Sequence, residues 1–273
     1  MTNVGNEFGQ VLISVLTASE GSGLRSMASG IIRRYELARV SPPVLLYTDR
    51  DCCGERKVSS LFTAWKELVI RLDVWHFMRR FVSGCTTDSH PLYGTFMARL
   101  SQCIFEWSSE DLILLKKAKT GELLNSKITN SSDEDIMRYV TKKELSTHVR
   151  RKTRGVQVTS MLISNLLEAF SGPQGTDTLG VPLLDSDRIW TIWQSQQKHI
   201  PCLQDPQDVQ LYTKTGTLVK GGIELPIYRC ARGSTSLESF HNHLHSFIPG
   251  KSLLMTNIID DDAKNNSYFP RLI

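Results

Sequence analysis

The chain of 273 residues lacks the features that would direct it into or across a membrane. No stretch approaches the roughly 20 consecutive apolar residues that a membrane-spanning helix requires, and the N-terminus shows no basic segment followed by an apolar one. The six cysteines include no Cys-x-x-Cys pair, so neither a zinc knuckle nor a disulfide framework is indicated. These absences favour a protein of the cytoplasm or the nucleus, with free thiols.

The sequence also lacks a strong excess of charge, since 32 basic and 28 acidic residues leave a net charge of +4. This balance permits a polyanionic partner without requiring one. One basic run stands out and contains no interleaved aromatic residues, which argues against a platform that stacks single-stranded bases. It is either a solvated helix end or a phosphate-contacting surface sensitive to salt, and its candidate residues are Lys142, Lys143, Arg150, Arg151, Lys152 and Arg154.

The most informative stretch is a predicted strand–helix–strand unit at residues 44–76. Apolar runs at 44–47 and 69–72 predict two parallel strands, and residues 57–65 between them read as a helix. Asp49 and Asp73 follow the two strands, at the sheet end where α/β folds place ligands and chemistry. The alternative is that each Asp only caps the helix that follows it.

The remaining chain divides into predicted segments by its hydrophobic periodicity. Residues 10–18 predict a strand after a turn at 6–9, and a helix follows from residue 24. Polar and apolar spacing then predicts helices at 91–107, 112–119, 135–150, 158–170 and 187–197. Strands return between 209 and 229, with a tight turn at Gly221-Gly222, and a helix follows at 237–247. The predicted parts are therefore 1–80, 81–205, 206–250 and a disordered tail at 251–273.

Two further groups of residues have metal-ligating chemistry. Glu238, His241 and His245 fall on one face of a predicted helix, which could contribute to a di-iron site or simply face solvent. The adjacent Cys52 and Cys53 could bind a metal, but without a second pair at ligand spacing the sequence gives only a weak indication of zinc.

Three stretches resemble the core of transposases of the Kyakuja–Dileera–Zisupton type, a group within the eukaryotic DDE transposases. They are Tyr-Thr-Asp-Arg-Asp-Cys-Cys at 47–53, Leu-Asp-Val-Trp-His-Phe at 72–77 and Arg-Gly-Ser-Thr-Ser-Leu-Glu-Ser-Phe-His at 232–241. The resemblance covers residues 6–249 and implies an RNase H-like α/β fold that binds Mg²⁺ or Mn²⁺ for cut-and-paste DNA transposition in the nucleus. By motif, Asp49 and Glu238 would be catalytic metal ligands, with Asp73, His76 and His241 in supporting roles.

The sequence departs from this family at its first catalytic Asp, which is expected on a strand preceding the turn at 6–9. No acidic residue lies before Asn6, and most of the strand that pairs with 10–18 is also expected to be missing. We therefore expect an incomplete RNase H-like sheet, interrupted by an all-helical insertion at 81–205, that is inactive as a truncated enzyme.

The alternative is a non-catalytic nucleic-acid or protein interaction module retained from a transposase. A helical metal oxidoreductase built on Glu238 and His241 ranks third. DNA is the expected partner, no membrane is expected, and a homo-oligomer is compatible with the sequence.

Overall fold

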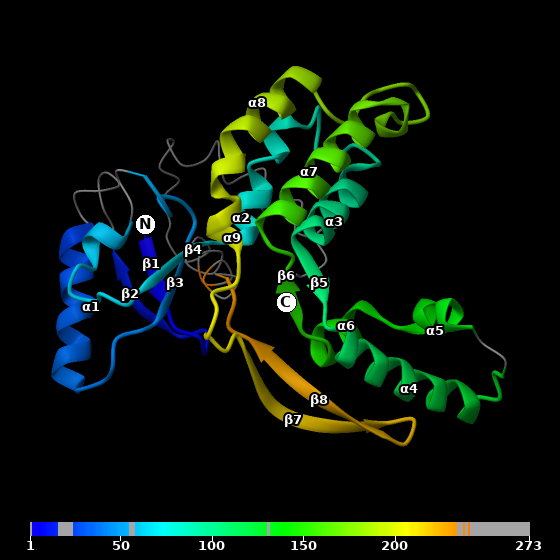
Figure 1. The fold of residues 1–273 in the computed structure, drawn as a ribbon, viewed down its shortest axis with the longest axis horizontal. Coiled ribbons are helices and arrows are strands. Elements are labelled where there is room, and N and C mark those ends of the chain that lie inside the picture. Colours follow the sequence, from blue (N-terminus) through cyan, green and yellow to red (C-terminus); the bar gives the residue numbers. More distant parts are fainter. Residues whose placement is uncertain are drawn as a thin grey trace, which may run out of the picture.

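The computed structural model describes residues 2–15, 24–54, 58–129, 132–233, 237 and 240. Over these ranges the chain has a mixed α/β fold in which the strands pair two by two. Figure 1 shows β1–β4 with α1 on one side, a helical body formed by α2, α3, α7 and α8, and an arm that carries α4–α6 above the β7–β8 hairpin. A continuous RNase H-like sheet stays a prediction.

The N-terminal part begins with an antiparallel hairpin of β1 (Thr2–Gly5) and β2 (Val11–Val15). Its turn is held by the Asn6 side-chain oxygen, which accepts hydrogen bonds from the backbone N–H groups of Phe8 and Gln10. Pairing runs from Thr2 opposite Val15 to Gly5 opposite Val11, so the expectation that most of this partner strand would be missing is wrong.

The predicted parallel strand pair is confirmed as β3 (Leu45–Thr48) and β4 (Val69–Leu72), in register from Leu45–Val69 to Thr48–Leu72. The first of these strands follows α1 (Leu24–Ala38), which buries Met27, Ala28 and Ile31 together with Phe62 and Trp65.

The helix predicted at 57–65 is wrong, because only a 3₁₀ turn, η1 (Val58–Leu61), forms there. The backbone N–H groups of Phe62, Trp65 and Leu68 each bond to the carbonyl three residues back. This tighter spacing brings the Phe62 and Trp65 rings into a stack with centroids 5.1 Å apart.

The largest core lies in the helical body and extends to the end of β4. Its elements are α2 (Val74–Arg79), η2 (Val82–Gly84), α3 (Tyr93–Ile104), α7 (Val156–Ser171), η3 (Pro173–Gly175), α8 (Ser186–Gln196), η4 (Gln197–His199) and α9 (Ile200–Leu203). Leu72 of β4 is fully buried in the same cluster as Phe77, Phe81 and Trp193. The strand-end region is therefore continuous with the helical core. None of the helices in the described ranges is long and apolar enough to span a bilayer.

The region predicted as an all-helical insertion contains a small sheet. Antiparallel strands β5 (Phe105–Trp107) and β6 (Arg151–Thr153) bracket α4 (Ser109–Asn125), α5 (Asp133–Tyr139) and α6 (Lys142–His148). The prediction of one helix at 91–107 is wrong in its last three residues, because β5 pairs there. The single helix predicted at 135–150 is also wrong, because a capping box of Thr141 and Glu144 starts a second helix.

The hairpin of β7 (Tyr212–Lys220) and β8 (Ile223–Cys230) packs on α4 and α6. Gly221 and Gly222 have φ values of +52° and +79°, which confirms the predicted tight turn. The tip approaches α4 so closely that a Cβ on Gly121 would lie 2.1 Å from the Gly221 carbonyl oxygen.

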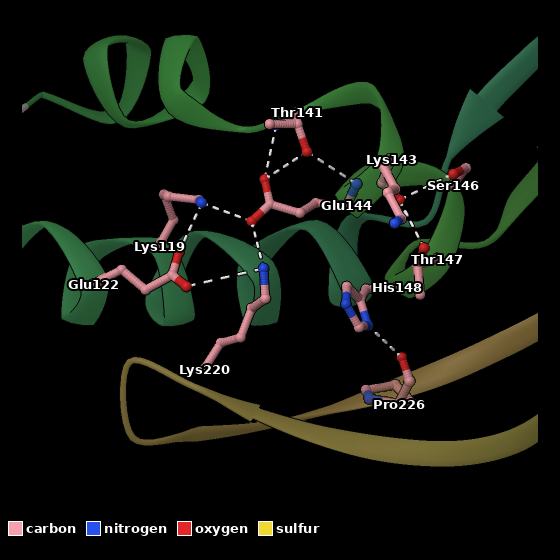
Figure 2. A network of polar contacts seen from close by, with 10 residues as sticks. All are labelled: Lys119, Glu122, Thr141, Lys143, Glu144, Ser146, Thr147, His148, Lys220 and Pro226. Carbon is pink, nitrogen blue, oxygen red and sulfur yellow. Dashed lines mark hydrogen bonds and ion pairs between the residues drawn. The ribbon is translucent and has the colours of Figure 1, made fainter.

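A buried ionic network fastens this hairpin to the two helices (Figure 2). Glu144, with its side chain 8% exposed, accepts hydrogen bonds from Lys119 of α4 at 2.6 Å and Lys220 of β7 at 2.8 Å. It also accepts from the backbone N–H and hydroxyl of Thr141. His148 Nδ1 lies 2.7 Å from the Pro226 carbonyl oxygen of β8. One carboxylate thus connects three elements that are far apart in the sequence.

Candidate active site at the ends of strands β3 and β4

The parallel pairing places Asp49 and Asp73 at the same end of the β3–β4 pair, one residue beyond each strand. The ladder continues past the strands, because the Asp73 N–H donates to the Thr48 carbonyl oxygen at 2.8 Å. The side chain of Asp49 is exposed, whereas Asp73 is only 3% exposed. Two carboxylates that follow the same pattern in the sequence therefore occupy very different environments.

Asp73 acts as the N-cap of α2, as the alternative interpretation of the sequence held. Its Oδ1 accepts a hydrogen bond from the backbone N–H of His76 at 3.0 Å and lies 3.0 Å from His76 Nδ1. The other oxygen, Oδ2, faces Gly233, where an added Cβ would lie only 2.9 Å away. Gly233 also has a φ of +87°, so both the close approach and the backbone favour glycine. Asp73 is thus placed to orient α2 and His76.

Arg232 anchors the segment that leads from β8 toward Glu238. Its side chain is 7% exposed, and its guanidinium forms a bidentate pair with Asp205, with Nε–Oδ1 and NH2–Oδ2 distances of 2.9 and 2.8 Å. It also donates to the Arg151 carbonyl oxygen and lies over the Phe105 ring. Burial lowers the pKa of Arg232, but the bonds to Asp205 outweigh it and raise the pKa above its ordinary value. This residue remains charged and fixes the segment.

Tyr47, the third residue of β3, also faces this region. Burial raises its pKa; the nearby charge of Arg232 opposes that rise, and those of Asp205 and Asp73 add to it. The hydroxyl is buried and has no hydrogen-bond partner among the described residues. The tyrosine therefore places a polar atom at the same strand end as Asp49.

Asp49 is held by its backbone and not by its carboxylate. Arg80 donates from NH2 to the Asp49 carbonyl oxygen at 2.9 Å and from NH1 to Gln196 Oε1 at 2.7 Å. The arginine thereby links the end of β3 to the end of α8. The carboxylate of Asp49 stays exposed beside a backbone fixed on the helical body.

Glu238 and His241 lie outside the described residues, as does most of the helix predicted at 237–247. Leu237 is described, and its Cδ2 would lie 2.9 Å from a Cβ added to Gly5 of β1. Gly233 therefore lies against Asp73, and Leu237 lies against Gly5 of β1.

All three predicted phosphate-contacting arginines take part in internal contacts. Arg150 donates two hydrogen bonds to Asp111, at 2.8 and 2.9 Å, and this bonding to the carboxylate raises the pKa of Arg150. Arg151 lies over the Phe105 and Trp107 rings, and Arg154 donates to the Phe105 carbonyl oxygen. These side chains fasten β6 to β5 and α4.

The three lysines of the same run are exposed. Lys142 and Lys143 occupy the first turn of α6, and Lys152 is 69% exposed while pairing with Glu106 at 3.1 Å. Phosphate contact from this run would therefore fall on the lysines more than on the arginines.

The residues at the strand ends meet the requirements of Mg²⁺ in part. An exposed carboxylate such as Asp49 supplies the oxygen ligand that Mg²⁺ prefers. Asp73 does not fit as a ligand, because His76 occupies one of its oxygens and Gly233 closes over the other.

Comparison with known proteins identifies no relative of this chain. No family model, curated protein or solved structure matches the chain. The functional argument therefore depends on the geometry of this site.

Arg232, Asp205 and Tyr47 were missed as site residues by sequence reasoning. Arg232 had one visible signal, because it opens the motif that contains Glu238.

Proposed function

We propose that this chain is a transposase-derived domain related to Mg²⁺-dependent DNA strand cleavage and transfer. The observation that carries the proposal is the meeting of three segments at one end of β3–β4. Asp49 follows β3, Asp73 follows β4, Gly233 lies against Asp73, and Leu237 lies against Gly5 of β1. RNase H-like carboxylate sites require such convergence of distant segments, and the resemblance of these same three stretches supports it.

In this proposal Asp49 and Glu238 hold Mg²⁺ or Mn²⁺. When bound, the metal polarises a phosphoryl oxygen and stabilises the charge that develops during phosphodiester displacement. Asp73 and His76 are positioning residues, because Asp73 caps α2 and orients the imidazole. Arg80 fixes the backbone of Asp49, and Arg232 fixes the chain just after β8.

The second candidate is a non-catalytic nucleic-acid module, favoured by the exposed lysines of α6 and β6. Lys142 and Lys143 stand at the start of α6 and have no role in the fastening of β6. A protein-interaction role is the remaining form of this alternative. For either nucleic-acid candidate, the resemblance and the basic run imply a location in the nucleus.

Fluorescence anisotropy with labelled duplex DNA, with and without Mg²⁺, separates the two candidates. The transposase-type site predicts that Mg²⁺ strengthens DNA binding and that Asp49→Asn removes this increment. The matched control Asp187→Asn, an exposed carboxylate in the first turn of α8, should keep it.

The binding module predicts no effect of Mg²⁺ and weaker binding in the double variant Lys142→Ala/Lys143→Ala. Loss of two phosphate contacts should reduce the slope of log affinity against log salt by about 2. Absence of DNA binding even at low salt would overturn both candidates.

A further inference from the structure

The loop after β3 and the end of the helical body bring together four side chains that suit a soft metal. They are Cys52, Cys53, His199 and Cys202, and one ligand atom from each lies within 4.8 Å of all the others. Cys52 and Cys53 precede His199 by almost 150 positions in the sequence. This separation explains why the adjacent cysteines alone gave only a weak indication of zinc.

The distances among Cys52, Cys53 and His199 agree with a tetrahedral site. The Sγ atoms of Cys52 and Cys53 are 3.8 Å apart, and His199 Nδ1 lies 3.3 and 3.4 Å from them. Zinc bonds of about 2.3 Å to sulfur and about 2.0–2.1 Å to nitrogen give tetrahedral edges of about 3.8 Å between sulfurs and about 3.5 Å between sulfur and nitrogen. The separation of 3.8 Å is also far too long for a disulfide, whose S–S bond is about 2.05 Å.

The local backbone explains how adjacent cysteines can point at one centre. Asp51 has a φ of +53° and Gly54 a φ of +90°, so the loop turns sharply on both sides of the pair. His199 ends η4 and Cys202 lies in α9, three residues later, which is about one helical turn. Such His-x-x-Cys spacing places both ligands on one face.

Cysteine binds metal as the thiolate, so the three thiols of the cluster lose their protons when the metal binds.

We propose that Cys52, Cys53, His199 and Cys202 form a closed, structural Zn²⁺ site. Four protein ligands leave no position for substrate, which distinguishes a structural zinc site from a catalytic one. Nitrogen and sulfur ligands also separate it chemically from the oxygen site at Asp49. Because these thiol protons are released to solvent on binding, the zinc affinity falls as the pH is lowered.

The site would fasten the loop after Asp49 to the helical body. Arg80 already ties the Asp49 backbone to Gln196, and the zinc site adds a second link three residues further along the loop. The metal would thereby hold Asp49 against α8 and α9. This role goes beyond the proposed DNA chemistry and does not depend on it.

Metal analysis of the untagged full chain tests the proposal. We expect one zinc per chain from purified protein, and one tetrahedral thiolate-bound Co²⁺, seen by its intense visible absorption, after chelation and refilling. Cys52→Ser and Cys202→Ser should weaken Co²⁺ binding at least about 100-fold, since even outer-shell changes cost 10–100-fold. Cys230→Ser is the matched control, because this half-buried thiol does not belong to the four-residue cluster and accepts hydrogen bonds from Arg232.

Circular dichroism shows whether each variant is folded before its Co²⁺ affinity is compared with that of the wild type. If a variant does not fold, Co²⁺ uptake by the wild-type chain still tests the proposal. Folded wild-type protein that takes up no zinc or cobalt would overturn the proposal. Undiminished Co²⁺ binding by the Cys52→Ser/Cys202→Ser double variant would do the same, as would a disulfide between these cysteines under reducing conditions. None of these results would bear on the predicted effect of Mg²⁺ on DNA binding, which tests the proposed function separately.

Discussion

Replacement of Glu144 by Gln offers a quantitative test of the ionic network that holds the β7–β8 hairpin. Burial raises the pKa of Glu144, but hydrogen bonds from Lys119, Lys220 and Thr141 outweigh it and lower the pKa from 4.5 to about 2. This difference corresponds to about 3 kcal/mol of stability at neutral pH, at about 1.36 kcal/mol per tenfold change in the proton affinity. Glutamine keeps the shape of the side chain and removes its charge.

The sign of the pH dependence follows from the lowered pKa. The stabilisation is complete well above pH 4.5 and is lost as the pH falls toward 2, because the unfolded chain takes up the proton first. Urea unfolding of wild type and Glu144→Gln should therefore differ by about 2–3 kcal/mol near neutral pH, and this difference should fall by about 2 kcal/mol near pH 3.

The control for this measurement is Glu224→Gln, which changes an exposed carboxylate on the same hairpin. It should shift the free energy of unfolding by no more than about 0.5 kcal/mol. A Glu144→Gln variant with wild-type stability at neutral pH would refute the reasoning. A difference that stays constant down to about pH 3 would refute the assignment of the lowered pKa.

Three further substitutions test the contacts that build the site and the arm. Arg232→Ala should lower the free energy of unfolding by about 3–5 kcal/mol, measured in urea, because it leaves Asp205 without its buried partner; a loss below about 1 kcal/mol would contradict the anchoring role. Asp73→Ala should cost about 1–2 kcal/mol through the lost cap of α2, whereas Asp73→Asn should retain most of that stability; equal losses for the two would exclude capping as the cause. Gly121→Ala should lower the thermal midpoint, because its Cβ would overlap the Gly221 carbonyl, while Gly94→Ala on α3 has open space and should not.

Local patterns predicted the elements that are fixed by neighbouring residues. The parallel pair before Asp49 and Asp73, the turn at Asn6 and the Gly221-Gly222 turn all follow from short-range signals and are confirmed. Helices α7 and α8 agree with their apolar periodicity to within a few residues.

The elements that sequence reasoning missed depend on partners far along the chain. The three-residue strand β6 exists because it pairs with β5. The arginines of this region resemble a solvated basic run, but Arg150 binds Asp111 and Arg151 lies over aromatic rings. The break before α6 depends on Thr141 and Glu144, whose carboxylate is held by Lys220 from another part of the chain. The cysteine cluster is the extreme case, since its two halves meet only in the folded molecule.

The most direct test of the proposed function is thermal unfolding of the full chain during a Mg²⁺ titration, with the thiol cluster kept loaded with zinc. A metal that binds the native state through Asp49 raises the midpoint temperature of unfolding. Once the metal concentration exceeds the dissociation constant, the rise is proportional to the logarithm of that concentration. We expect this rise in wild type and in Asp187→Asn, and its loss in Asp49→Asn. A midpoint temperature that does not change with Mg²⁺, or that rises equally in Asp49→Asn, would contradict a carboxylate metal site at the end of β3.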